Sequence, residues 1–301
     1  MKKNNLISLF SLLSIAIVLN ACSDDSPSRA DMEEPGIAEI AATNAQFSTL
    51  SGALEATGLD EALNGDGEFT VFAPTDEAFA ALPEGTLESL TSEQLEGILL
   101  YHVLGAQVLS GQLGSEQTVE TLGGENMFIT SGSAGVAVNG TASVTSVDIE
   151  ARNGVIHVID NVILPDAYGT IVDNAVKRYF LSSLVDAVLQ AELAGALSGE
   201  GPFTVFAPVN SAFAAIAGVA SDLTAEELAD VLLYHVVQGE VLSSDLQASQ
   251  EVPTLNGDSI LIEVSGSGAT VNGSAAITTV DIQGVNGVIH IIDQVLLPPS
   301  E

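Results

Sequence analysis

Residues 69–79 read FTVFAPTDEAF, and the same stretch returns as FTVFAPVNSAF at residues 203–213. The run from Phe69 to Ala73 is short, aromatic and β-branched, which predicts a buried strand that ends at the proline. Two further segments recur in the same order: Tyr101-His102-Val103 returns as Tyr234-His235-Val236, and Asn153-Gly154-Val155-Ile156-His157 returns as Asn286-Gly287-Val288-Ile289-His290. The offset between copies is 134 residues for the quoted stretch and 133 for these two segments. Such a period is the size of a domain, since solenoid units run roughly 20–50 residues. The chain therefore contains two related domains in tandem.

Each copy begins with signals for helices. Apolar residues recur at helical spacing over residues 37–54 and again over 171–188. Thr91 and Thr224 each begin a capping box, in which a hydroxyl and a side chain three residues later satisfy orphan amides before an amphipathic helix. After the first strand, Thr75 or Asp76 is expected to cap a further short helix.

The second part of each copy predicts strands. Asn139-Gly140 and Asn272-Gly273 stand between alternating runs, and Asn-Gly favours a type I′ hairpin because both positions need positive φ. The last runs, 155–159 and 288–292, are apolar on both faces, which is typical of central strands. Helices that come first and strands that come later predict an α+β fold with a covered sheet.

These segments together resemble the fasciclin-like domain, and the resemblance extends over residues 37–298. It implies two tandem domains, each a β-sandwich wedge with packed helices, with boundaries at 36–166 and 167–299. It also implies a secreted or anchored cell-surface adhesion module. In animal relatives, a Tyr-His motif and an Asp-Ile motif before the last strand are implicated in receptor binding. By position, the resemblance therefore implies these candidate binding residues: Tyr101, His102, Asp148, Ile149, Tyr234, His235, Asp281 and Ile282.

The residues themselves support several interpretations of these positions. We expect Tyr101 and Tyr234 to be half-buried packing residues with the hydroxyl at the rim. Asp148 and Asp281 precede the last strand, where loops meet solvent, so surface binding and turn formation remain open for them.

The four histidines occupy equivalent positions, two in each copy. His102 lies on the apolar face of a helix and His157 in an apolar strand, which favours neutral core residues over metal ligands or catalytic bases. Asp76 becomes Asn210 in the second copy, and both side chains can cap a helix although only one ionises, so capping is favoured over a role that needs charge. The sequence shows no zinc spacing, nucleophile elbow, phosphate loop or dinucleotide fingerprint. We therefore expect no enzyme activity, no metal site and no cofactor.

Residues 1–21 predict a bacterial lipoprotein signal peptide. Two lysines precede the apolar stretch from Leu6 to Leu19, which is shorter than the roughly 20 residues that span a bilayer. The segment ends Leu-Asn-Ala-Cys22, which resembles a lipobox although its asparagine departs from the usual choice. Cys22 is the single cysteine of the chain, which favours lipidation over an ordinary secretory signal with an incidental cysteine. Residues 22–35 are polar and acidic and predict a disordered tether.

The charge of the chain excludes nucleic-acid binding. With 40 acidic against 6 basic residues the net charge is −34, a field that repels nucleic acids and anionic membranes, so we expect membrane contact only through the lipid anchor. The scattered carboxylates favour a solvated surface over a specific cation site.

We therefore expect an outer-membrane lipoprotein, exposed at the cell surface, that adheres to an extracellular polysaccharide, a matrix or a cell-surface protein. The alternative hypothesis is a periplasmic or surface protein that binds a small ligand in an inter-domain cleft.

Overall fold

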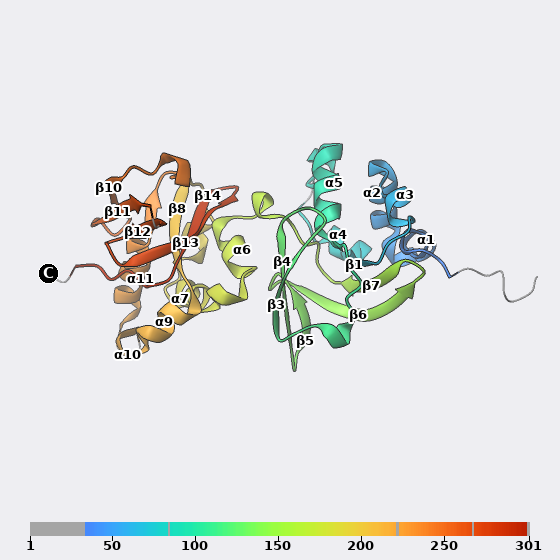
Figure 1. The fold of residues 1–301 in the computed structure, drawn as a ribbon, viewed down its shortest axis with the longest axis horizontal. Coiled ribbons are helices and arrows are strands. Elements are labelled where there is room, and N and C mark those ends of the chain that lie inside the picture. Colours follow the sequence, from blue (N-terminus) through green and yellow to red (C-terminus); the bar gives the residue numbers. More distant parts are fainter. Residues whose placement is uncertain (1–33, 84, 221–222, 267, 300–301) are drawn as a thin grey trace, which may run out of the picture. The chain divides into compact units, whose positions relative to one another are not determined.

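The computed structural model describes residues 34–299 apart from 84, 221–222 and 267. The predicted signal peptide, Cys22 and most of the predicted tether lie outside these residues. The described chain forms two consecutive α+β domains with the same order of elements (Figure 1). None of the described helices is long and apolar enough to cross a membrane.

The first domain has its helices mostly ahead of its strands. Its elements are α1 (Ile37–Thr43), η1 (Ala45–Phe47), α2 (Ser48–Thr57), α3 (Leu59–Leu63), β1 (Phe69–Pro74), α4 (Asp76–Ala80), η2 (Leu87–Ser89), α5 (Ser92–Tyr101), β2 (Val103–Leu104), η3 (Ser110–Gln112), β3 (Glu116–Glu120), β4 (Asn126–Gly132), β5 (Gly135–Val138), β6 (Ala142–Ala151) and β7 (Gly154–Ile159).

The second domain repeats this order. Its elements are η4 (Asp166–Tyr168), α6 (Ile171–Val176), η5 (Tyr179–Leu181), α7 (Ser182–Gln190), α8 (Ala194–Leu197), β8 (Phe203–Pro208), α9 (Asn210–Ala215), α10 (Ala217–Ala220), α11 (Ala225–Tyr234), β9 (Val236–Gln238), η6 (Ser243–Asp245), β10 (Ser249–Pro253), β11 (Ser259–Ser265), β12 (Gly268–Val271), β13 (Ala275–Gly284) and β14 (Gly287–Ile292).

Each domain contains a seven-stranded mixed sheet. The strand orders are β2-β1-β7-β6-β5-β4-β3 and β10-β11-β12-β13-β14-β8-β9. The quoted strand β1 pairs in parallel with β7 from Phe69↔Gly154 to Pro74↔Ile159, and β8 pairs with β14 in the same register. The last strand of each domain is fully buried and lies between two neighbours, so the prediction of a central strand is confirmed.

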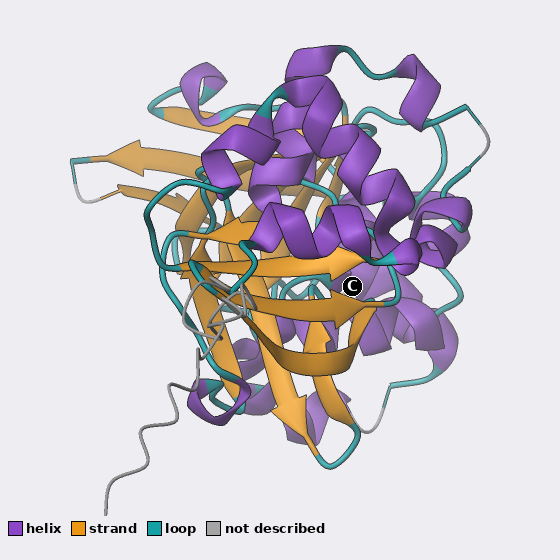
Figure 2. Cartoon of the chain, turned by 90° about the vertical axis from the view of Figure 1, so that its right-hand side faces the viewer, coloured by secondary structure: helices purple, strands orange, loops and turns teal. Residues whose placement is uncertain are grey.

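The quoted strand divides its side chains between two cores. In β1, Val71 and Ala73 face the helices and pack with Phe47, while Phe72 points to the opposite face and packs with Ile129 of β4. The same alternation in β8 follows from the period of two residues in a strand. Each domain therefore has one apolar layer between helices and sheet and a second layer enclosed by the sheet itself. Figure 2 shows the helices packed against the strands.

The local signals of the sequence are found where they were expected. Thr91 and Thr224 each accept a hydrogen bond from the backbone N–H three residues on, so both capping boxes form. Asn139-Gly140 has φ values of 52° and 68°, and Asn272-Gly273 has 52° and 70°, as the type I′ hairpin requires.

The capping prediction for Asp76 needs a correction. Thr75 is the N-cap of α4, whereas the Asp76 carboxylate accepts hydrogen bonds from Ser48 Oγ (2.6 Å) and from the Thr49 N–H (2.8 Å) at the start of α2. Asn210 accepts the Ser183 N–H (2.9 Å) at the start of α7 in the same way. Both side chains therefore cap a helix, but a neighbouring one, because the fold brings the two helix starts together.

Candidate functional site

Tyr101 and Tyr234 end the helices α5 and α11 and are buried, with 1% and 3% exposure. The Tyr101 hydroxyl donates to the Asn126 carbonyl (3.0 Å) and accepts from Nδ2 of Asn139 (2.9 Å). Burial raises the pKa of Tyr101 well above its usual value. The expectation that these hydroxyls lie at the rim is therefore wrong. The sequence does contain a sign of this burial, because the asparagine of each Asn-Gly hairpin is the residue that donates a hydrogen bond to the tyrosine hydroxyl.

His102 and His235 are neutral core residues, as the sequence predicted. Nδ1–H of His102 donates to the Ile98 carbonyl (2.7 Å), and Nε2 accepts the N–H of Ile163 (3.2 Å). His235 makes the equivalent two bonds at 2.8 Å each. Burial lowers the pKa of both histidines to about 4. Because both ring nitrogens are occupied, neither histidine has a free nitrogen for a metal or a proton transfer.

Asp148 lies within β6 at an irregularity of the β6–β7 register, and Asp281 holds the equivalent place in β13. Their φ values are 55° and 59°. The sequence analysis expected these residues in a loop that meets solvent, but both are part of a bulged strand. A bulge re-aims the side chain, which explains how a strand residue reaches the loop beside it.

The Asp148 carboxylate fastens the loop before β3. It accepts the N–H of Ser110 (2.8 Å) and a short hydrogen bond from the Ser110 hydroxyl, and these two bonds lower its pKa. The Asp148 N–H donates to Nδ1 of His157 (3.2 Å), and the Nε2–H of that ring donates to the Val108 carbonyl (2.9 Å). The second domain repeats this arrangement with Asp281, Ser243 and His290.

The Asp-Ile and Tyr-His candidates are thus engaged inside each domain. Ile149 and Ile282 pack against the helix-side core. A direct contact between a partner and the buried tyrosine or histidine would need the domain to open. The half-buried Asp148 is the most accessible of the first domain's polar candidates, and its role in binding remains a prediction.

A cluster that the sequence analysis missed joins the two domains. Residues 177–180 read Lys-Arg-Tyr-Phe, where the first copy has Thr-Asn-Ala-Gln at residues 43–46. These are basic and aromatic residues in a chain that is poor in both, and they differ completely between copies. That contrast is the sequence signal that could have identified them.

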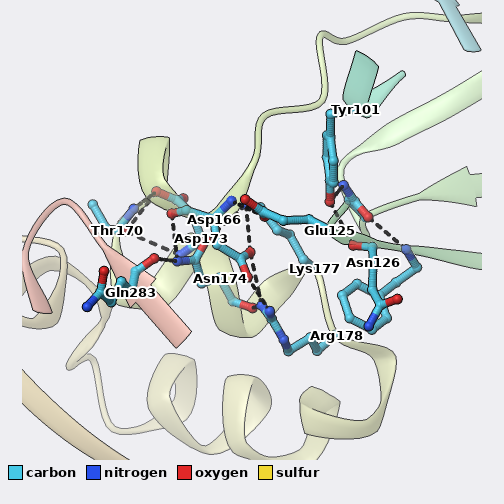
Figure 3. Close-up of polar contacts among 12 residues, drawn as sticks. Tyr101, Glu125, Asn126, Asp166, Thr170, Asp173, Asn174, Lys177, Arg178 and Gln283 are labelled. Carbon is cyan, nitrogen blue, oxygen red and sulfur yellow. Dashed lines mark hydrogen bonds and ion pairs between the residues drawn. The ribbon is translucent and has the colours of Figure 1, made fainter. Parts of the chain in front are cut away.

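Asp166 is the centre of the polar part of this junction. Its carboxylate accepts from Lys177 Nζ (3.2 Å) and forms a short ion pair with Arg178, as Figure 3 shows. Its N–H donates to the Glu125 carboxylate in the first domain (2.9 Å). Burial lowers the pKa of Lys177, while Asp166 opposes that shift. Both cations are also bonded to Asn174, so the charges are paired rather than offered to a ligand.

Aromatic contacts form the apolar part of the junction. The ring of Phe128 in β4 lies 5.8 Å from that of Phe180 and 6.3 Å from that of Tyr179, both edge to face. The Arg178 guanidinium stands 5.1 Å from the centre of the Phe128 ring, within cation–π range. The Gly140 turn approaches the Val176 carbonyl closely.

The described residues contain no group of three or more His, Cys, Asp or Glu side chains that could hold a metal ion. Among the residues that the structure describes, the junction and the two candidate motifs also display no assembled catalytic constellation.

Each half of the chain has a sheet with a helical layer, and each contains the same Tyr–Asn and Asp–Ser hydrogen bonds. The chain is therefore a tandem pair of one domain type. The fasciclin domain model matches residues 45–165 and 180–298, so the chain belongs to the fasciclin family. Human periostin is 33% identical over 243 residues, covering 80% of this chain and 28% of periostin. The present chain thus spans less than a third of that relative.

A bacterial relative and a solved structure agree with this assignment. The cell surface glycolipoprotein MPB83 of Mycobacterium bovis is 33% identical over 145 residues, which cover 46% of this chain and 64% of that protein. The structure of a domain pair from the insect cell adhesion molecule fasciclin I superposes with a TM-score of 0.58 at 18% identity. It covers 85% of this chain and 98% of the insect chain, and it shows that the fold is that of a fasciclin pair.

Proposed function

We propose that this protein is a lipid-anchored adhesion protein of the bacterial outer membrane, exposed at the cell surface. The observation that carries the proposal is the combination of two fasciclin domains with a single cysteine, Cys22, at the end of a signal-like segment. A fasciclin pair occurs in an insect cell adhesion molecule, and a bacterial relative is named a cell surface glycolipoprotein. Both facts support the proposal by similarity.

Two domains on one anchor suit adhesion to a repetitive partner. The partner is an extracellular polysaccharide, a matrix or a protein of another cell. Binding by one domain raises the effective concentration of the other, so two weak sites give a strong attachment. The net charge of −34 disfavours anionic partners unless divalent cations bridge the two surfaces.

The anchor is tested with the Cys22→Ser variant in the producing cell. We expect the protein to leave the membrane fraction and cell attachment to fall to the level of a deletion strain, because no acyl chain can be attached. Protease treatment of intact cells should remove the wild-type domains. A Cys22→Ser protein that stays in the membrane fraction contradicts the lipid anchor, and domains that resist protease contradict surface exposure.

The adhesive role is tested by deleting the second domain from the anchored protein. Attachment to a matrix-coated surface should fall far more than twofold, because avidity is lost together with one site. A glycan and matrix-component array probed with residues 23–301, with and without calcium, identifies the partner and any cation bridge. Unchanged attachment after the deletion contradicts the avidity argument.

A further inference from the structure

The second domain has an apolar cavity at a place where the first domain has a depression lined partly by polar residues. It lies under the helices α6, α7 and α8, against the buried face of β8 and β14, and has a volume of about 90 Å³. Its lining side chains are aliphatic with one exception, His235. The cavity is inside one domain, and it involves neither the junction cations nor the Asp-Ile motif.

The two copies differ at the positions that surround this cavity. Val185, Leu189 and Ala194 line its opening in the second domain, and the first domain has Ser51, Glu55 and Asp60 at the equivalent positions. Those three polar residues line the corresponding depression of the first domain. One fold therefore carries an apolar opening in one copy and an acidic one in the other.

Deeper in the cavity, Val188 replaces Leu54 of the first copy, so a methylene that fills the first domain is missing from the second. Leu189 stands at the mouth with 59% of its surface exposed. An exposed leucine beside an apolar cavity extends the apolar surface outward. The cavity and its mouth thus form one continuous apolar track.

The chemistry of the walls selects an uncharged occupant. Both ring nitrogens of His235 are bonded to the backbone, so the cavity offers no partner to a water molecule, which needs two to four polar contacts. The neighbouring cations, Lys177 and Arg178, are already paired with Asp166. Asp173 and Asp186 are exposed on the two helices that frame the opening. An anionic head group would therefore meet negative charge, and the two neighbouring cations are already paired.

The size of the cavity selects the shape of the occupant. Its volume is smaller than the roughly 150 Å³ of an engineered cavity that accepts benzene. A ring would not enter without displacing the walls, whereas the end of a linear chain would. We propose that the second domain binds an uncharged lipid-like molecule through the end of a linear hydrocarbon chain, inserted between α6 and α7.

The test is a titration of the two-domain chain with octan-1-ol, followed through the methyl chemical shifts of its valines and leucines. We expect saturable shifts confined to the cavity, at Val185, Val188 and Leu189, and none at Leu54. Octanoate, which has the same chain length and a negative charge at pH 7, should bind at least about tenfold more weakly because the carboxylates of Asp173 and Asp186 flank the apolar opening.

Variants that copy the first domain provide the decisive comparison. Leu189→Glu should weaken octan-1-ol binding by roughly tenfold, the effect of about two lost methylene contacts. Val188→Leu should weaken binding, because the added methylene takes up part of the cavity. Val285→Glu is the matched control, because Val285 is an exposed apolar residue of the same domain (64%) outside the cavity, and binding should be unchanged.

Circular dichroism would establish that each variant is folded. Linear shifts without saturation, equal binding of octanoate, or a Leu189→Glu protein that binds as the wild type does would overturn the proposal. The cavity would then be a packing defect.

Discussion

The Gly140 turn provides the sharpest test of the contact between the two domains. Gly140 and Gly273 occupy the same place in their hairpins, with φ of 68° and 70°, so alanine is strained to the same degree at both. They differ only in what surrounds them. A Cβ at Gly140 would stand 2.6 Å from the Val176 carbonyl oxygen, whereas at Gly273 the nearest atom, a side-chain oxygen of Glu263, is 3.7 Å away.

The expected cost of Gly140→Ala has two parts. The left-handed conformation alone should lower the free energy of unfolding by about 1–2 kcal/mol, and Gly273→Ala should show that part only. Relief of the clash at Gly140 requires the Val176 segment to move away from β4, which uncovers Phe128. Phe128 is 5% exposed, whereas its counterpart Leu261 is 37% exposed. Uncovering roughly 60 Å² of the ring adds about 1.5 kcal/mol at ~25 cal/mol per Å².

The assay is urea denaturation of both variants, with hydrogen exchange of the amides at 176–180 as a second readout. Gly140→Ala should be less stable than Gly273→Ala by about 1.5 kcal/mol, and its exchange at 176–180 should be faster. Equal stabilities and equal exchange in the two variants would refute the idea that this turn supports the junction.

Three further predictions concern polar groups that form hydrogen bonds within the domains. Burial lowers the folded pKa of His102 and His235 to about 4, whereas an unfolded histidine titrates near about 6.5. The stability that each neutral histidine contributes is therefore complete above pH ~6.5. It is lost as the pH falls towards ~4, by up to about 3 kcal/mol for each histidine. Urea midpoints between pH 7.5 and 4.5 should fall for the wild type and fall less for His102→Asn, so equal slopes would contradict the assignment. Asp76→Asn should keep the wild-type thermal midpoint, because an amide caps the equivalent helix in the second domain, whereas Asp76→Ala should lower the midpoint. A loss of stability in Asp76→Asn would show that the charge matters. Asn139→Ala removes one of the two hydrogen bonds of the Tyr101 hydroxyl and leaves the Phe128 N–H without its partner, and it should cost about 2–3 kcal/mol. This cost should exceed that of Asn272→Ala, because Asn272 is exposed; the reverse order by chemical denaturation would count against this account.

Much of the secondary structure could be predicted because its signals are local. A capping box needs four residues and a type I′ turn needs two, and the strand at Phe69 is marked by its own composition. Each of these signals is complete within a short stretch of chain, so the duplicated sequence carries it twice. The neutral state of His102 was also predictable, since an apolar helix face implies burial.

The candidate site was predicted less well because its partners are distant in sequence. Asp76 caps a helix that begins 28 residues earlier, and Asp148 binds a serine 38 residues away. Tyr101 reaches Asn139 across the same separation. No local pattern encodes such pairs, so the rim position expected for the tyrosine and the loop position expected for Asp148 were both wrong.

The sequence by itself determined that this chain is a duplicated fasciclin unit with helices, hairpins and central strands in a fixed order. Periodicity, turn chemistry and the repeat are properties of neighbouring residues, and they survive without knowledge of the fold. Only the tertiary structure decided which polar groups are buried, how Arg178 and Phe128 join the two domains, and that an apolar cavity replaces the acidic depression of the first copy. Those outcomes depend on packing among residues far apart in the chain, where one methylene at Val188 or one charge at Glu55 changes what a surface can bind.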